Sequence, residues 1–243
     1  MPIVATARRA GEALLSLFFP PHCANCDADT SAGVHLCDAC AGKARRIEPP
    51  MCERCSEPYA GAIFETFTCA NCAERKLHFD CAVAPYLSRG VVREFIHRFK
   101  YDRERYLRQP LAAWLAEALN DERLTCRAFD LIVPVPLHST RQRERGFNQA
   151  AELATLLSHR CGVPVADALQ RIRYTTTQTR LAREERMENL RGAFRVRRAD
   201  LVQSRHLLLV DDVFTTGSTV DECARVLRQA GAASVRVATV ARG

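Results

Sequence analysis

The chain has 243 residues, of which 47% are hydrophobic and 26% are charged, and its formal net charge is +7 at pH 7. That hydrophobic content excludes a globally disordered protein, and the length allows one large domain or two modest ones. Arginine supplies most of the positive charge, since there are only three lysines. Arginine suits phosphate ligands, on a small molecule or on a nucleic acid, although a basic composition does not require them.

A helix with an apolar face is expected at the N-terminus, over residues 3–19. We expect that face to pack on the next element of the chain, with a peripheral membrane contact as the alternative. Glu12 interrupts the apolar run, and no small-residue cleavage site precedes Pro20, so the segment is a poor signal peptide and too short to span a bilayer. The sequence therefore predicts a cytoplasmic protein, or one at the inner face of the membrane.

Four Cys-x-x-Cys pairs follow within residues 23–72. They are Cys23 with Cys26, Cys37 with Cys40, Cys52 with Cys55, and Cys69 with Cys72. In a reducing compartment such pairs are typical of metal ligands, and two of them complete a four-thiolate zinc site. Disulfides in a secreted protein and iron–sulfur ligation are the chemical alternatives. The simplest assignment is two structural Zn²⁺ sites in sequence order, while a pairing of the first knuckle with the third stays open.

These ribbons contain too few apolar residues to fold alone, so metal binding would supply their stability, an apparent ~10–16 kcal/mol per site. The composition changes near residue 81. We therefore predict an N-terminal helix and double zinc ribbon over residues 1–80, and a second domain over residues 81–243. The remaining cysteines lie in apolar or helical surroundings and are interpreted as small core residues: Cys81, Cys126, Cys161 and Cys223.

The second domain is expected to start with two amphipathic helices, around residues 91–99 and 107–119, and neither shows an obvious site. A buried strand over Phe129–Val135 and a helix over Asn148–Arg160 follow. The loop between them carries three arginines at alternate positions: Arg141, Arg143 and Arg145. They suit a diphosphate, because ligands of open α/β sheets bind at the carboxyl ends of the strands. A solvated charged loop is the alternative.

A second arginine-rich stretch covers residues 171–198. Its arginines are Arg171, Arg173, Arg180, Arg183, Arg186, Arg191, Arg195, Arg197 and Arg198. Residues 174–181 have no hydrophobic period and are predicted to form a mobile loop, and Ala193–Val196 a short strand. Together with the first arginine group, this stretch predicts a positive surface for single-stranded nucleic acid. The alternative is that these arginines bind only a small phosphate ligand or face water.

Residues 207–223 combine an apolar run, an acidic pair and a loop rich in hydroxyl groups. We expect Leu207–Val210 to be a buried parallel strand with Asp211 and Asp212 at its end. A helix should begin at Thr219, with Glu222 completing a capping box. Between them lies the loop Thr215, Thr216, Gly217, Ser218 and Thr219. Unpaired backbone N–H groups and the positive helix end converge there, which predicts a phosphate site. A last strand is expected over Val235–Val240.

This strand, loop and helix resemble the binding motif of type I phosphoribosyltransferases. In that family the loop binds the 5-phosphate of phosphoribosyl pyrophosphate (PRPP) and the acidic pair binds the ribose hydroxyls. Carboxylates accept strong, charge-assisted hydrogen bonds from such hydroxyls. The resemblance implies that Asp211, Asp212 and residues 215–219 bind PRPP with Mg²⁺, which offsets the charge of the diphosphate. A polar strand end and a receiver domain are the alternatives, but receivers carry their acidic pair near the start of the chain.

The whole chain resembles the ComF family, the competence-protein-F group also called amidophosphoribosyltransferase-like. The resemblance is carried by the Cys-x-x-Cys pairs after Phe18–Pro21, and by Val133–Leu137, Arg145–Gln149, Gln178, Leu181, Arg186, Asn189, Arg191–Phe194 and Val210–Thr219. It implies an α/β fold with the parallel sheet of a type I phosphoribosyltransferase domain, preceded by a small Cys-rich zinc-ribbon module.

Two functions are compatible with that resemblance. The first is a PRPP-binding accessory protein of DNA uptake in natural transformation, which handles single-stranded DNA beside a helicase-like partner. The second is an active phosphoribosyltransferase with an unidentified acceptor, in nucleotide metabolism or in a gluconate-linked branch of the family. No base-selective hood is recognisable in the sequence, so neither the acceptor nor a catalytic residue is identified.

Overall fold

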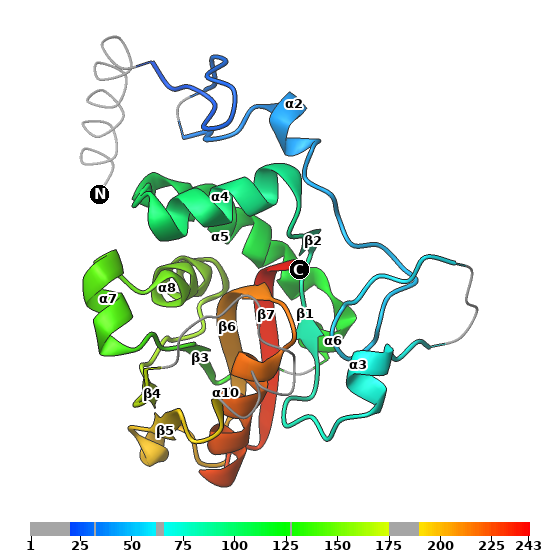
Figure 1. The fold of residues 1–243 in the computed structure, drawn as a ribbon, viewed down its shortest axis with the longest axis vertical. Coiled ribbons are helices and arrows are strands. Elements are labelled where there is room, and N and C mark those ends of the chain that lie inside the picture. The colour runs from blue at the N-terminus through cyan, green and yellow to red at the C-terminus, as the bar shows by residue number, and fades with distance from the viewer. Residues whose placement is uncertain (1–19, 32, 62–65, 127, 175–189) are drawn as a thin grey trace.

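The structure is a computed structural model that describes residues 20–31, 33–61, 66–126, 128–174 and 190–243 (Figure 1). The helix predicted over residues 3–19 and most of the loop predicted over residues 174–181 lie outside the described residues. Arg180, Arg183 and Arg186, and with them Gln178, Leu181 and Asn189, also lie outside them. Among the residues that are described, no helix combines the length and the apolar character needed to cross a membrane.

A parallel sheet forms the centre of the molecule. Its strands are β1 (Ala82–Val83), β2 (Tyr86–Leu87), β3 (Leu131–Pro134), β6 (His206–Phe214) and β7 (Ser234–Arg242). The spatial order is β1-β7-β6-β3, with β2 also on β7, and every pair is parallel. The predicted α/β class with a parallel sheet is therefore confirmed. Strands β6 and β7 are central, and every residue of β7 and most residues of β6 are buried, as expected for strands covered on both faces.

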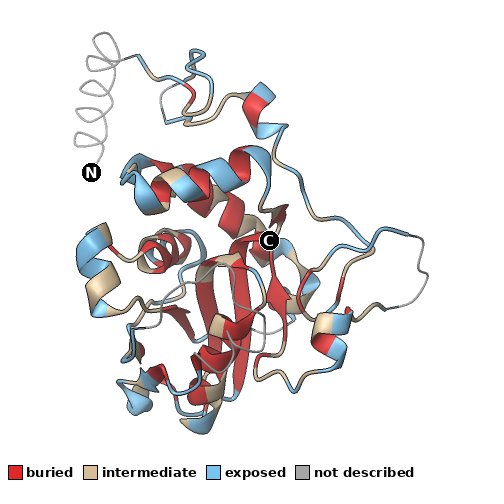
Figure 2. Ribbon diagram, in the orientation of Figure 1, coloured by how far each residue is buried: buried red, intermediate tan, exposed pale blue. Residues whose placement is uncertain are grey.

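Helices cover both faces of this sheet (Figures 1 and 2). Successive side chains of a strand point to opposite faces, so Leu208 and Val210 of β6 join one core cluster while Leu207 and Leu209 join the other. The first cluster is closed by α4 (Gly90–Tyr101), η1 (Arg105–Leu107), α5 (Arg108–Ala116), η2 (Glu117–Asn120), α6 (Glu122–Thr125) and α8 (Gln149–Cys161). The second is closed by α10 (Ser218–Gln229), the antiparallel pair β4 (Leu169–Arg171) and β5 (Phe194–Val196), and the turn η3 (Ala199–Leu201).

The two cysteine groups occupy different surroundings. We call residues 20–48 ribbon 1, which contains α2 (Asp38–Ala41), and residues 49–77 ribbon 2, which contains α3 (Ala70–Ala73). Ribbon 1 lies over α4 and is largely exposed (Figure 2). Ribbon 2 contributes its cysteines to the same apolar cluster as β6 and α10. The division into domains at residue 80 stays a prediction, but ribbon 2 shares the core of residues 81–243.

Several predicted elements are confirmed and others differ at their ends. Helix α8 has Asn148 as its N-cap, with the side-chain oxygen accepting from the Ala150 N–H, and Gly162 as a left-handed C-cap. Strand β6 continues four residues beyond the predicted end at Val210, because pairing with β7 carries on to Phe214. Of the four cysteines interpreted as core residues, Cys81 and Cys223 are buried, whereas Cys126 and Cys161 are exposed at helix ends.

The predicted capping box is wrong. Helix α10 begins at Ser218, and its N-cap is Gly217 rather than Thr219. The Glu222 carboxylate does not turn back to the helix start: it accepts from the Gly192 N–H at 2.7 Å and binds the Arg225 guanidinium. A longer-range contact with the chain before β5 therefore outcompetes the local capping interaction.

Candidate functional site

The loop between β6 and α10 has the geometry expected of a phosphate-binding loop. Gly217 has a φ of 76°, and a Cβ atom on it would lie 2.5 Å from Cζ of the Phe214 ring, so only glycine fits. The hydroxyls of Thr216 and Ser218 lie 2.9 Å apart, and the first N–H groups of α10 have no partner within the helix. A small hollow beside them is lined by Asp211, Phe214, Thr215, Gly217, Ser218 and Thr219, among others. Hydroxyls, free N–H groups and a helix N-terminus thus converge on one point.

The acidic pair lies inside β6, and not after it as predicted. Asp211 is half-buried and pairs in register with Thr239 of β7, while Asp212 is 2% exposed. The Asp212 N–H donates to a carboxylate oxygen of Asp211 at 2.9 Å. Burial, together with the neighbouring charge of Asp212, raises the pKa of Asp211 to about 7. One member of the pair is therefore close to its titration point at neutral pH.

Lys100 is a site residue that the sequence interpretation missed. Its ammonium lies 2.8 Å from a carboxylate oxygen of Asp212, and it comes from the last turn of α4, a helix in which no site was expected. An amphipathic helix pattern reveals the buried face, but it cannot show which strand end that face reaches. The ion pair joins α4 to β6 directly beside the phosphate loop.

The first arginine group lies on a short helix, α7 (Ser139–Arg145), where a loop was predicted. Residues four positions apart lie on the same face of a helix, so Arg141 and Arg145 share one side of α7 and Arg143 lies on another. Arg141 and Arg145 line a cavity of about 340 Å³ together with Lys100, Tyr101, Arg103 and Glu144, whereas Arg143 is exposed and is not among the lining residues. Burial lowers the pKa of Arg145, and the carboxylates of Asp212 and Asp211 act in the opposite direction.

Two exposed tyrosine rings flank these arginines. The Arg145 guanidinium lies 5.4 Å from the centre of the Tyr101 ring, and that of Arg141 lies 5.9 Å from the Tyr174 ring. Both distances suit cation–π contacts. Arg171, at the end of β4, was predicted only as part of a basic surface, but burial lowers its pKa and it lies within electrostatic range of Asp211 and Arg141. The basic cavity and the acidic pair thus form one continuous site.

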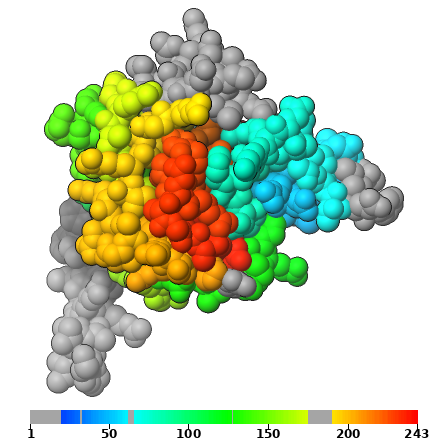
Figure 3. Space-filling model, turned by 90° about the horizontal axis from the view of Figure 1, so that it is seen from below, coloured from blue at the N-terminus to red at the C-terminus, as the bar shows by residue number. Residues whose placement is uncertain are grey.

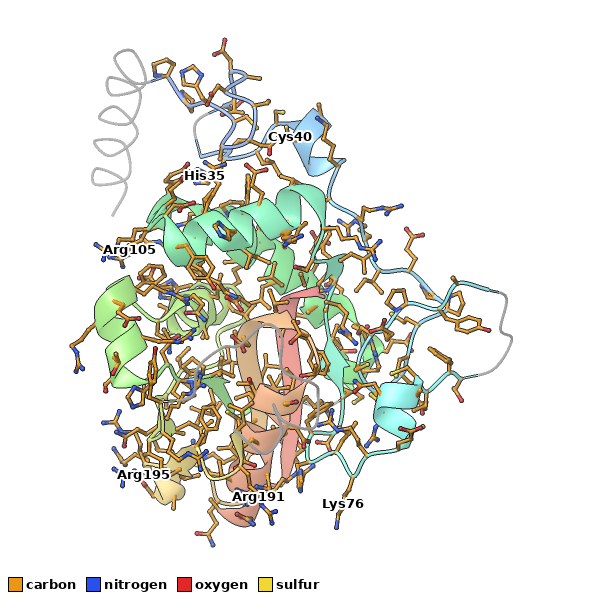
Figure 4. The ribbon with its side chains drawn as sticks, viewed as in Figure 1. His35, Cys40, Lys76, Arg105, Arg191 and Arg195 are labelled. Atoms are coloured by element: carbon orange, nitrogen blue, oxygen red, sulfur yellow. The ribbon has the colours of Figure 1, made fainter. Side chains whose placement is uncertain are left out.

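The cysteines form two groups in sequence order, which excludes the interleaved pairing. Cys23, Cys26, Cys37 and Cys40 form one group, and Cys52, Cys55, Cys69 and Cys72 form the other; within each group the sulfur atoms all lie within 4.8 Å of one another. Every described cysteine is a free thiol, so the disulfide alternative has no support here. Figure 4 shows Cys40 in ribbon 1, at the opposite end of the molecule from Lys76 at the end of ribbon 2.

Both groups fit zinc. Four sulfurs at ~2.3 Å from a tetrahedral Zn²⁺ would lie about 3.8 Å apart. The sulfurs of Cys26 and Cys37 are 3.7 Å apart, and those of Cys55 and Cys69 are 3.6 Å apart. Backbone N–H groups of Cys37 and Cys69 each donate to the first sulfur of their own group at 3.4 Å. Such donors stabilise thiolates. The predicted pair of structural zinc sites is thus supported by the donor set as well as by its spacing.

Comparison with protein-family models gives two matches. Residues 14–76 match a double zinc ribbon domain, and residues 143–243 match a phosphoribosyl transferase domain. The second match contains β6, the acidic pair and the phosphate loop. Both parts of the predicted architecture are confirmed.

Curated relatives match most of the chain. It is 36% identical to "DNA utilization protein YhgH" of Escherichia coli (strain K12) over 211 residues, which are 83% of this chain and 88% of that protein. It is 30% identical to "Competence protein F" of Haemophilus influenzae over 234 residues, 93% of this chain and 98% of that protein. Among solved structures, a glutamine PRPP amidotransferase from B. subtilis matches 54% of this chain and 25% of its own, with 22% identity and a TM-score of 0.36.

Proposed function

This chain belongs to the ComF family, and on that basis we propose that it is a PRPP-binding, phosphoribosyltransferase-like accessory protein of DNA uptake. The observation that carries the proposal is the order of features along one edge of the sheet. A phosphate loop, a carboxylate pair and a basic cavity follow one another, as the phosphate, ribose and diphosphate of PRPP do.

In this proposal each part of PRPP has a partner of suitable chemistry. The 5-phosphate binds the hydroxyls and N–H groups of residues 215–219, where anions are favoured by the start of α10. The ribose hydroxyls donate to the carboxylates of Asp211 and Asp212. The diphosphate lies beside Arg141 and Arg145 in the cavity, where two guanidinium groups can bind it in a bidentate manner. Arg143 stays a predicted ligand, although its exposure favours the other two.

Mg²⁺ is part of the proposal because a diphosphate and two carboxylates would otherwise repel each other. Hard oxygen ligands of phosphate and carboxylate are those that Mg²⁺ prefers. Lys100 neutralises Asp212 in the structure, and it would stay as a fixed cation beside the diphosphate. Asp211 has no ion pair at that distance among the described contacts, so its carboxylate is the better candidate for the ribose or the metal.

Calorimetry with PRPP and Mg²⁺ tests the proposal. We expect the wild-type chain to bind, and the double variant Asp211→Asn with Asp212→Asn to lose binding while keeping its zinc. Arg141→Met should weaken binding by roughly tenfold, the loss of one charge-assisted contact. Arg143→Met, on the other side of α7, should weaken it less. Unchanged PRPP affinity in the double aspartate variant would show that PRPP does not bind at Asp211 and Asp212.

The raised pKa of Asp211 gives PRPP binding a pH signature. A carboxylate that accepts from ribose must be ionised, so affinity should fall as the pH drops from 8 to 6 through the pKa of about 7. The stability of the ligand-free protein should depend on pH in the opposite direction. Asp211 holds its proton more tightly when folded, so its contribution to the free energy of unfolding without ligand declines as the pH rises from ~4, the unfolded pKa, towards 7. In Asp211→Asn both dependences should be reduced.

Binding of single-stranded DNA is the second part of the proposal. Arg191 and Arg195, at the far end from ribbon 1 (Figure 4), are exposed, as are Arg173, Arg197 and Arg198. Fluorescence anisotropy with labelled oligothymidine at increasing salt measures their role. If about four arginines contact phosphates, the log–log slope should be roughly −3. Charge reversal at Arg197 and Arg198 should flatten it by ~1 or more. A helicase-like partner would act on the same strand.

One observation favours the enzymatic alternative, a transferase with an unidentified acceptor. The cavity of about 340 Å³ exceeds what two diphosphate-binding arginines require, and Tyr101 exposes its ring at the rim. An aromatic ring beside a basic cavity could stack a planar acceptor. Release of pyrophosphate from PRPP in a screen of nucleobases would favour this alternative, whereas binding without turnover favours the accessory role.

A further inference from the structure

Two buried arginines hydrogen-bond to the backbone of the phosphate loop, Arg75 from ribbon 2 and Arg242 from the end of β7. Arg75 donates to the Thr216 carbonyl at 2.9 Å, and Arg242 donates to the Thr215 carbonyl at 2.6 Å. Each side chain is only 7% exposed. Hydrogen bonds from a charged donor are stronger than neutral ones, so these two contacts fix consecutive peptide units of the loop.

Fixing a carbonyl also fixes the N–H group of the same peptide unit. In a trans peptide the C=O and the following N–H point in opposite directions. When the carbonyls of Thr215 and Thr216 face the arginines, the N–H groups of Thr216 and Gly217 face away from them. Consecutive N–H groups presented on one side form an anion-binding nest. The arginines therefore act on the phosphate site through the backbone, without touching the ligand themselves.

Both arginines are connected to ribbon 2. Arg75 follows the last cysteine of that ribbon by three residues, and its N–H donates to the Cys72 carbonyl at 3.4 Å. Arg242, the last residue of β7, forms an ion pair with Glu57. The Glu57 carbonyl accepts from the Cys52 N–H at 2.8 Å, so this acidic residue is part of the turn that the first knuckle of ribbon 2 makes.

The segment from Arg75 to His78 also contacts the first turn of α10. The His78 N–H donates to a carboxylate oxygen of Asp221 at 2.7 Å, and the Arg75 guanidinium lies 3.7 Å from the other oxygen. The Asp221 side chain is 10% exposed, so this buried charge depends on its partners. Figure 3 shows the chain after ribbon 2 lying against α10 on this face of the molecule. Loop and helix start are thus held by one short segment.

We propose that ribbon 2 is a positioning element of the phosphate site, with Arg75 as its main contact. Zinc on Cys52, Cys55, Cys69 and Cys72 would keep the ribbon folded and thereby keep Arg75 and Glu57 where they hold residues 215–217. Ribbon 1 has no described contact with that loop. The identity of the ligand rests on the proposed function, but the positioning of the loop does not.

Arg75→Met tests the proposal with Arg123→Met as its matched control. Arg123 also ties ribbon 2 to the sheet domain, by donating to the Glu53 carbonyl and the Ser56 hydroxyl at 3.0 Å, but it lies away from the loop. We expect Arg75→Met to weaken PRPP binding roughly tenfold and to raise amide hydrogen exchange at residues 215–219, with two zinc ions retained. Arg123→Met should change neither quantity by more than about twofold, whatever its effect on stability.

Arg75→Lys covers the case in which the methionine variant fails to fold, because it keeps a cation near Asp221 but loses the guanidinium fork. Amide exchange at residues 215–219 equal to that of the wild type in the lysine or methionine variant would overturn the positioning role, even if PRPP binds. Faster exchange in a protein whose wild type binds no PRPP would support the positioning role and remove the proposed ligand. The two proposals therefore fail separately.

Discussion

Ribbons 1 and 2 have the same ligand chemistry and similar spacing, but the fold uses them differently. In ribbon 1, Cys26 is exposed and Cys37 is half-exposed. Its polar contacts with the sheet domain include Arg98, which donates to the Ala24 carbonyl at 2.7 Å, and, at the end of the ribbon, Ile47, whose N–H donates to the Pro85 carbonyl at 2.8 Å. In ribbon 2 all four cysteines are buried and belong to the core cluster of β6 and α10. The two Cys-x-x-Cys ribbons thus have the same ligands, but only ribbon 2 is part of the core of the sheet domain.

The difference shows that the structural role of a zinc site depends on the residues packed around it, since the ligands of the two sites are the same. Zinc in ribbon 1 closes a loop over α4, and its loss would leave the sheet and both of its apolar faces in place. Zinc in ribbon 2 holds part of the core and the segment that carries Arg75. The comparison therefore predicts unequal consequences when equivalent residues of the two ribbons are changed.

The largest expected effect is on stability when one ligand is removed from each ribbon. Cys72→Ser should lower the free energy of unfolding by several kcal/mol, a large part of the roughly 5–15 kcal/mol typical of a domain, because it opens a site within the core. Cys40→Ser should release one zinc and leave the main thermal transition nearly unchanged. Calorimetric melting with zinc analysis of both variants measures this. Equal losses of stability in Cys72→Ser and Cys40→Ser would contradict the proposed difference between the two ribbons.

A smaller difference is expected at hydroxyl groups that brace each ribbon. Ser56 is fully buried; its hydroxyl donates to the Ala82 carbonyl at 3.0 Å and accepts from Arg123. Ser56→Ala removes both hydrogen bonds at a fully buried position and should cost about 1–3 kcal/mol. In ribbon 1 the Thr30 hydroxyl donates to the Val34 carbonyl at 2.8 Å in an exposed turn, so Thr30→Ala should cost no more than ~0.5 kcal/mol.

Urea unfolding of the two alanine variants measures these costs. A Thr30→Ala variant as unstable as Ser56→Ala would mean that ribbon 1 is as tightly integrated as ribbon 2.

Sequence patterns predicted those parts of the molecule that are encoded locally. The zinc ligands, the buried strand Leu207–Val210, and the loop ending in Thr219 all lie within short segments whose residue types and spacing suffice. The remaining site residues come from elsewhere: Lys100 reaches Asp212 from α4, and Arg75 reaches Thr216 across 141 residues of chain. Such contacts depend on which helix covers which strand end, and periodicity in one sequence does not contain that information.

Errors in the prediction had the same origin. Asp211 and Asp212 were expected at the end of the strand, because the apolar run stops at Val210, but pairing with β7 extends β6 to Phe214. The capping box at Thr219 and Glu222 fitted the local pattern, yet Glu222 binds the Gly192 N–H. In both places a tertiary contact outweighs a local preference.

The smallest expected effect is a reciprocal one, on zinc affinity. If zinc in ribbon 2 strengthens PRPP binding through Arg75, PRPP must strengthen zinc binding in ribbon 2 by the same factor, since coupling free energies are mutual. The Cys40→Ser variant isolates ribbon 2, because its remaining zinc is held by Cys52, Cys55, Cys69 and Cys72. Saturating PRPP with excess Mg²⁺ should raise the zinc affinity of this variant by roughly tenfold, as measured in competition with a chromogenic chelator.

The matched control adds Asp211→Asn and Asp212→Asn to Cys40→Ser, so that any direct chelation of zinc by PRPP is present in both samples and only the bound ligand differs. Zinc in ribbon 1 provides the second comparison: its affinity in the wild-type chain should not respond to PRPP, because Arg98 ties that ribbon to α4 and its described contacts do not include residues 215–219. An equal response of both zinc ions would mean that PRPP stabilises the chain as a whole. A response confined to ribbon 2, and lost in Arg75→Met, would locate the coupling in the contact between Arg75 and Thr216.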